Sequence, residues 1–365
     1  MIFSLQSYLY IYLVVVVILG FTPIYKIDNN KNKALLYKFI IFILFVLATV
    51  LFLSRDINAS SDISHYYRMY EKALTFEDIF LSYHGNVFFT FILYIGNLFE
   101  LDKELFFLTL PIFYLLIYYV GIKQITKNIK LQILMLSFFM LSSTYILLFT
   151  NVIRQGLAMS LFILAIGLYI NNKKILVYFM MVFSLFSHFS MIPMILVFYI
   201  AQMLMKKGIT SKIFFISIIS AVSGFAIIEY LPVIGGIFYK IERFADQEYE
   251  SNIIYVKIAL LFCFLILFYY YGKRLNLFDQ RSFKYVFLVY MLGVNLILFS
   301  MPIIKMASRF IYYPSALLPI LFAFTFLPKN NLLPVKQRFL FYFIFTVIYS
   351  LFVFNFQSIT KQLGV

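Results

Sequence analysis

The chain has 365 residues, of which 64% are hydrophobic and only 12% are charged. Its mean hydropathy is +0.95, whereas soluble domains are about 45–50% apolar and about 25% charged. These values exclude a soluble enzyme and a secreted disulfide scaffold. The net charge of +15 does not indicate a nucleic-acid partner, because Lys and Arg form short clusters between apolar runs and not one solvated patch. The composition predicts an all-α polytopic membrane protein.

Runs of about 20 apolar residues are long enough to cross the hydrocarbon core of a bilayer. We expect about 12 transmembrane helices in a single membrane domain covering 1–365. The first run is expected to be a retained span, because no cleavage pattern follows it. The only cysteine, Cys263, lies within a run, so no internal disulfide is possible. The predicted spans are 3–21, 34–53, 104–122, 131–149, 154–170, 175–187, 189–205, 213–231, 254–272, 283–301, 308–327 and 338–356.

The loop charges predict the orientation. If the amino terminus is outside, the inside loops hold 19 Lys and Arg but only two acids, Asp28 and Asp279. The other 11 basic residues then share the outer side with 13 acids. Because cytoplasmic loops carry the positive excess, both termini are expected to be external. Two long external loops follow, 54–103 and 232–253.

Residues 85–99 are apolar but too short to span a bilayer as a helix, because 1.5 Å per residue gives only about 22 Å. Counting them as a span would also invert every later loop. Asn86, Thr90, Tyr94 and Asn97 form one polar stripe along this run. We therefore expect a helix that lies in the membrane interface or re-enters from it. A short span facing a cavity is the alternative.

Ionisable residues near the spans are the candidates for a functional site. Arg154 and Arg309 each stand at the predicted amino end of a helix that descends from outside, with Asn151 and Ser308 as plausible helix caps. A helix amino end beside a guanidinium suits an anion, especially phosphate. Arg55 is a weaker third candidate. The alternative is that each arginine extends to the interface or pairs with an external acid.

Two residues are candidates for a general base. His188 lies at the turn between two short runs, where an imidazole in a recessed wet pocket could take a proton. Its alternative role is a hydrogen-bonded histidine at an interfacial turn. Asp62 lies in a Ser/Asn-rich turn and could be a base or could cap the helix that follows it. Three histidines without a nearby ligand pattern predict no metal site.

The order of these residues resembles one family. Asp62-x-x-x-Tyr66 is followed by Ile153-Arg154-Gln155-Gly156-Leu157-Ala158 and then by Phe186-Ser187-His188-Phe189-Ser190. This order is similar to that of the EpsG family of Wzy-type polymerases of bacterial surface polysaccharide, and the resemblance covers most of the chain. Family members often have His-x-Ser-Ala where this chain has His188-Phe-Ser190-Met, which leaves the role of Ser190 open.

The resemblance implies a GT-C-like fold and a metal-independent glycosyltransferase without a cofactor. Donor and acceptor would be undecaprenyl-pyrophosphate-linked oligosaccharides, joined on the outer face of the bacterial plasma membrane. Arg154, Arg309 and Arg55 would bind the diphosphate, His188 or Asp62 would take the proton, and Gln155, Tyr66 and Tyr312 would contact other parts of the substrate. The lipid bilayer, a chain-length regulator and a flippase are the expected partners. An O-antigen ligase and a non-enzymatic flippase or transporter are the alternatives.

Overall fold

The structure is a computed structural model. It describes residues 5–21, 31–59, 62–81, 86–207, 214–215, 218–219, 223, 251–301 and 303–326. The predicted span 338–356, nearly all of the predicted span 213–231 and the external loop up to residue 250 lie outside these residues. The described residues fall into two compact units, residues 1–191 with 326–365 and residues 192–325. Each unit is treated separately below.

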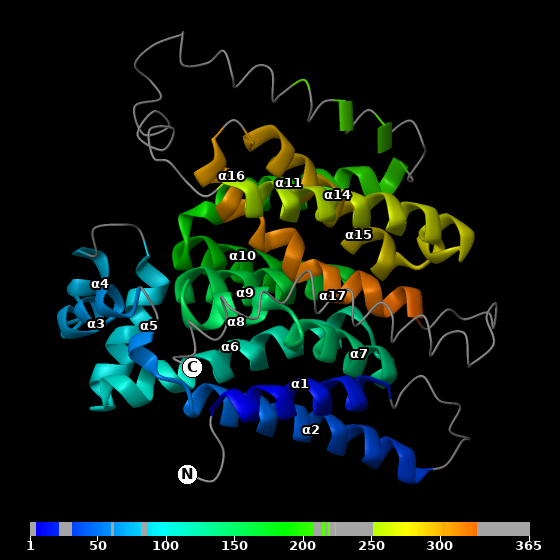
Figure 1. Ribbon diagram of the computed structural model, residues 1–365. Helices are drawn as coiled ribbons and strands as arrows, with labels where there is room; N and C mark the ends of the chain where they lie inside the picture. Colours follow the sequence, from blue (N-terminus) through cyan, green and yellow to red (C-terminus); the bar gives the residue numbers. More distant parts are fainter. Residues whose placement is uncertain are drawn as a thin grey trace, which may run out of the picture. The chain divides into compact units, whose positions relative to one another are not determined.

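The described part of the chain is helical, as expected (Figure 1). Within it, six helices are long and apolar enough to cross a membrane, which supports a helical membrane protein. The helices α10 (Lys174–Ser187) and α11 (Ile192–Lys207) are also apolar but shorter. The expected count of about 12 spans therefore stays a prediction. The six candidate spans are Leu35–Leu53, Lys103–Ile125, Ile153–Ile170, Ile254–Arg274, Arg281–Ser300 and Ile304–Phe326.

The long helices of the first unit begin and end close to the predicted runs. α6 (Lys103–Ile125), α9 (Ile153–Ile170) and α10 extend the runs 104–122, 154–170 and 175–187 by three residues or fewer at each end. α1 (Leu5–Phe21) and α2 (Lys31–Leu53) agree equally well with 3–21 and 34–53. Apolar run length is therefore sufficient to locate these helices.

The predicted span 131–149 is broken into two helices. The chain forms α7 (Ile129–Met140) and α8 (Ser143–Thr150), which are bent by 70° relative to each other. Ser142 causes the break, because its hydroxyl donates to the Phe139 carbonyl and accepts from the backbone N–H of Tyr145. It thus ends one helix and caps the next.

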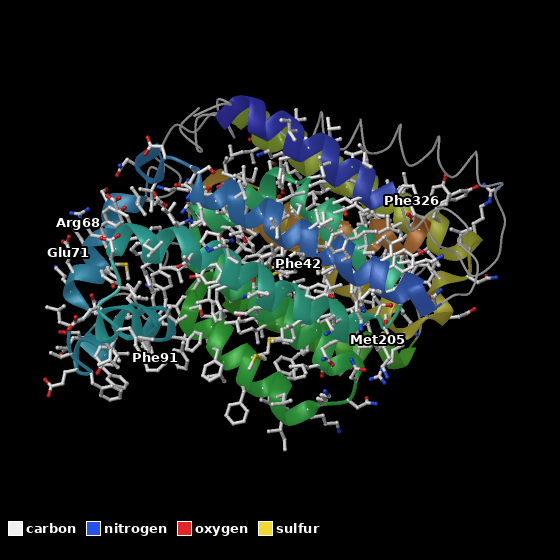
Figure 2. All side chains as sticks on the ribbon, turned by 90° about the horizontal axis from the view of Figure 1, so that it is seen from below. Phe42, Arg68, Glu71, Phe91, Met205 and Phe326 are labelled. Carbon is white, nitrogen blue, oxygen red and sulfur yellow. The ribbon has the colours of Figure 1, made fainter. Side chains whose placement is uncertain are left out.

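The loop 54–103, which is predicted to be external, folds into short helices between α2 and α6. They are η2 (Ile57–Ala59), α3 (Ile63–Lys72), α4 (Asp78–Leu81) and α5 (Val87–Leu98). α3 is amphipathic, with Ile63, Tyr66 and Tyr70 buried. Arg68 and Glu71 project from its outer side (Figure 2). The loop thus presents one face of α3 to the interior.

The helix α5 corresponds to the short run 85–99 and has only 12 residues. Its polar stripe is explained by contacts within the protein: Asn86 and Thr90 are buried, and the Asn97 amide donates to the carbonyls of Tyr70 and Ala73 at 2.7 and 2.9 Å. The stripe therefore binds α5 to the end of α3. Its expected interfacial or re-entrant position remains a prediction.

The helices α6, α9 and α10 pack side by side in the core of the first unit (Figure 1). A Cβ at Gly167 would lie 2.7 Å from the carbonyl oxygen of Gly121, so small residues let α6 and α9 approach closely. α10 runs back along α9, and the hydroxyl of Ser184 donates to the Ala158 carbonyl at 2.7 Å. This contact aligns the carboxyl end of α10 with the amino end of α9.

The second unit contains α11 and a second group of helices. They are α14 (Ser251–Arg274), η5 (Leu277–Asp279), α15 (Arg281–Ser300), α16 (Ile304–Phe310) and α17 (Tyr312–Phe326), the last residue of which belongs to the first unit. Two buried phenols cross-link them: Tyr285 donates to the Phe198 carbonyl and Tyr290 to the Leu261 carbonyl. These bonds hold α15 between α11 and α14.

Candidate functional site

Arg154 and Tyr66 meet in the first unit, although they come from different predicted elements. Arg154 is the second residue of α9, at the amino end, as expected. The Cζ atom of its guanidinium lies 5.6 Å from the centre of the Tyr66 ring on α3, a distance at which cation–π attraction operates. Tyr66 is only 2% exposed. The loop 54–103 thus brings a phenol to the helix end that carries the arginine.

The electrostatic environment keeps the Tyr66 phenol neutral. Burial raises its pKa above the ordinary value; the charge of Arg154 and its hydrogen bonds oppose this shift, and the carboxylate of Asp62 adds to it. A neutral phenol can still donate a hydrogen bond. Asp62, Tyr66 and Arg154 therefore form one electrostatically connected group.

Asp62 does not cap its helix in the way the alternative supposed. It occupies the N-cap position of α3, but its side chain accepts no capping hydrogen bond. The carboxylate instead influences the phenol of Tyr66, one turn further along.

Arg55 is buried just beyond the end of α2. Only 5% of it is exposed, and its Nη2 donates to the Phe107 carbonyl at 3.0 Å. Burial lowers its pKa to about 10, although the neighbouring Tyr67 opposes this shift. Its Nε and Nη1 atoms have no hydrogen-bond partner in the described part of the chain. Arg55 is still charged at neutral pH.

Several other buried donors in the same region lack partners. Among the described residues, no hydrogen-bond partner is found for the Nε atom of Arg154 or for the hydroxyls of Tyr67 and Tyr114. Such unpaired groups cost stability in an apolar surrounding. A bound anion, which accepts hydrogen bonds and donates none, would satisfy them.

No sequence pattern distinguishes Tyr67 or Tyr114 from the other tyrosines. The chain contains 30 tyrosines, and most buried tyrosines in an apolar helix serve only to pack. Tyr67 is adjacent to the motif residue Tyr66, and that adjacency is the only signal available. Gln155, expected to contact substrate, is buried beside Arg154 as the third residue of α9.

His188 follows the last residue of α10, in the turn before η3 (Phe189–Met191), as expected. The backbone N–H of Ser190 donates to its Nδ1 at 3.1 Å, and the Ser190 hydroxyl lies 2.9 Å from the same atom. In the neutral imidazole the proton therefore resides on Nε2. With this tautomer Nε2 is a donor, whereas Nδ1 already accepts the backbone N–H of Ser190. The bond between Ser184 and Ala158 places His188 at the same end of the helix pair as Arg154.

Arg309 and Tyr312 lie in the second unit, and Arg309 does not stand where the sequence analysis placed it. It is in the last turn of the short helix α16, not at the amino end of a helix. α17 begins only at Tyr312, because Pro314 fits the first turn of a helix better than its interior. The helix-end argument for Arg309 is therefore wrong.

The two expected caps are also wrong. Asn151 ends α8, and Val152 precedes α9 at the N-cap position. Ser308 lies within α16 and donates to the Lys305 carbonyl. The apolar runs gave no indication of either short helix, so each cap was assigned to the wrong residue.

The sequence matches the EpsG family over residues 38–362. No curated protein and no solved structure gives a significant match. The matched range contains Arg55, Asp62, Tyr66, Arg154 and His188, all in the first unit. Since the match covers most of a chain whose helices are long and apolar enough to cross a bilayer, this membrane protein belongs to the EpsG family.

Proposed function

We propose that the protein is a polymerase of lipid-linked oligosaccharide repeat units on the outer face of the bacterial plasma membrane. The observation that supports this proposal best is the meeting of Asp62, Tyr66 and Arg154. Two separate parts of the family motif come together there, next to buried donors without partners. A site of this kind suits a phosphate-containing leaving group.

The reaction breaks the bond between the anomeric carbon of the donor sugar and the diphosphate oxygen. A hydroxyl oxygen of the acceptor sugar forms the new bond to that carbon, and its proton passes to a base. Arg154, Tyr66 and Arg55 stabilise the departing diphosphate, which leaves with the undecaprenyl chain. Asp62 takes the proton, because His188 in its neutral form offers a donor at Nε2. His188 donates a hydrogen bond to the substrate.

Gln155 orients the substrate from its place beside Arg154. Arg309 and Tyr312, in the second unit, are proposed to contact the lipid-linked substrates as well. The donor and acceptor diffuse to the site within the bilayer. A flippase supplies them and a chain-length regulator limits the product.

The test is a polymerisation assay with the purified full-length chain in liposomes and one lipid-linked repeat unit as sole substrate. Wild-type protein should produce a ladder of products, and Arg154→Ala should abolish it. Arg154→Lys should restore only part of the rate, since an ammonium cannot reproduce the planar contacts of a guanidinium. Arg68→Ala is the matched control, because Arg68 is an exposed arginine on the outer side of α3.

The same assay distinguishes the alternatives. A ligase would transfer the unit to a lipid A core acceptor and would produce no ladder without it. A flippase or transporter would move the unit between leaflets and would form no glycosidic bond. Full activity of Arg154→Ala would contradict the proposed site.

A further inference from the structure

Tyr114 is a buried phenol that the proposed reaction does not yet use. It lies near the middle of α6, is 0% exposed, and its ring packs edge-on against Phe149 at a centroid distance of 5.9 Å. Its hydroxyl has no hydrogen-bond partner among the described residues. Because a phenylalanine would fill the same space without an unpaired hydroxyl, packing alone does not explain a tyrosine here.

The hydroxyl of Tyr114 lies close enough to Tyr66 for the two phenols to interact electrostatically. Tyr66 in turn contacts Arg154, whose Nε atom also has no hydrogen-bond partner among the residues that the structure describes. Tyr114 also lies near the start of α9, because the Phe149 ring on which it packs would be 3.0 Å from a Cβ at Gly156, two residues after Arg154. Of Tyr66, Tyr114 and Arg154, Tyr114 belongs to the candidate membrane span Lys103–Ile125.

The chemistry of this group selects its ligand. Arg154 contributes only donors, and a neutral phenol readily donates. An oxyanion accepts a hydrogen bond from each of them and requires no acceptor in return. Within the part of the chain described, neither Arg55 nor Arg154 forms an ion pair with a carboxylate.

We propose that the Tyr114 hydroxyl donates a hydrogen bond to the phosphate oxygens that Arg154 binds, so that Tyr114 is the membrane-side binding residue of the diphosphate site. This inference rests on the proposed function. The ligand chemistry is a diphosphate, whether it is carried on a polyprenyl lipid or free in solution.

The experiment measures the affinity of the purified full-length chain for undecaprenyl diphosphate and for inorganic diphosphate, and its melting temperature without ligand. The variants are Tyr114→Phe, Arg154→Ala and the control Tyr118→Phe. Tyr118 lies one turn further along α6, equally buried, and its ring stacks on Phe139 at 3.8 Å.

We expect Tyr114→Phe to weaken diphosphate binding about tenfold or more, the effect of a lost hydrogen bond to a charged group. Its melting temperature without ligand should be unchanged or higher, because the substitution removes an unpaired buried hydroxyl. A merely structural role would lower the melting temperature instead. Tyr118→Phe should bind as wild type does. Weakening for undecaprenyl diphosphate alone, or for both ligands, supports the proposal and identifies the source of the diphosphate.

Wild-type affinity in Tyr114→Phe, together with loss of binding in Arg154→Ala, would overturn the role of Tyr114 and leave the proposed function intact. A lower melting temperature in Tyr114→Phe with unchanged affinity would also overturn it. If wild-type protein binds neither diphosphate, both this inference and the proposed diphosphate site are wrong.

Discussion

The Nδ1 atom of His188 accepts a hydrogen bond from the backbone N–H of Ser190. This bond determines which proton transfer the imidazole can perform. Asp62 occupies the N-cap position of α3, and its carboxylate acts electrostatically on the Tyr66 phenol. We therefore expect Asp62→Asn to reduce the polymerisation rate about a hundredfold, as the loss of a general base usually does. His188→Gln, which retains a donor, should cost less than tenfold. Ladder formation with time measures both rates.

The acid limb of the pH profile gives an independent check on the base. Carboxylates and imidazoles titrate near pH 4 and near pH 6.5 in unstructured peptides. A profile that falls already between pH 7 and 6, together with an inactive His188→Gln, would return the role of base to His188. Normal expression and melting temperature are the controls for both variants.

The charged guanidinium of Arg55 is buried, and this burial lowers the stability of the protein without ligand. Burial lowers its pKa to about 10. The penalty is therefore present at every pH below about 10 and disappears as the pH rises towards the ordinary pKa of arginine. Arg55→Met should stabilise the empty protein at pH 7 by roughly 1–3 kcal/mol. The same variant should bind diphosphate more weakly. Thermal unfolding in detergent and ligand binding measure the two effects.

Diphosphate affinity should therefore be constant between pH 7 and 9 in the wild type and should fall above about pH 10, where Arg55 loses its proton. Arg55→Met should lose that alkaline decrease. Arg68→Met, at an exposed position on α3, is the matched control. A less stable Arg55→Met with unchanged affinity would show that the arginine has a structural role.

Individual site residues could be predicted only where their residue type is rare in this chain. Asp62, Arg154 and His188 stand out because charged and imidazole groups are scarce near apolar runs. Their partners could not be selected from the sequence, since Tyr114 is one of 30 tyrosines and only the packing of α6 against α3 and α9 reveals its unpaired hydroxyl. The tautomer of His188 likewise depends on a local turn that periodicity does not describe.

At the scale of helices, Gly156 sets how closely α8 approaches α9. A Cβ at Gly156 would overlap the backbone carbonyl of Leu148, which cannot move aside as a flexible side chain would. Gly156→Ala should therefore destabilise the protein by about 1–3 kcal/mol and displace Arg154, two residues earlier. Melting temperature and ladder formation should both decrease.

Gly293→Ala provides the comparison. It is also a helical glycine in a candidate span, but an added Cβ would be 3.7 Å from its nearest neighbours, an ordinary contact. Its melting temperature should stay close to that of the wild type. Equal effects of the two substitutions would show that alanine is tolerated or rejected for reasons other than the close contact of α8 with α9.

Helix positions could be predicted from the length of apolar runs, but helix breaks could not. The run 131–149 is apolar at most of its positions, so hydrophobic periodicity does not reveal the 70° bend at Ser142. A capping signal was present, because Ser142 is followed by Ser143 and Thr144. The short helix α16 was not predicted either, because apolar run length does not reveal where one helix ends and the next begins. The position of Arg309 within its helix was therefore predicted wrongly.

At the scale of the whole molecule, the orientation of the chain rests on its loop charges. Six loops that are expected inside hold 19 basic residues and two acids. Because cytoplasmic loops carry an excess of Lys and Arg, this distribution predicts the topology. The helices by themselves are compatible with either orientation, because apolar run length carries no direction. The proposed outer-face site depends on this assignment.

Cysteine labelling tests that assignment in intact spheroplasts, on a Cys263→Ala background that removes the one native thiol. Asn58 lies just before α3 in the first external loop, and Asn172 lies in the turn between α9 and α10; both are exposed. Asn58→Cys should react with a membrane-impermeant thiol reagent, whereas Asn172→Cys should react only after the membrane is opened. Labelling of both in opened membranes is the control for reactivity. The reverse pattern would place Asp62, Tyr66 and Arg154 on the cytoplasmic side, where a polymerase of externally displayed repeat units could not use them.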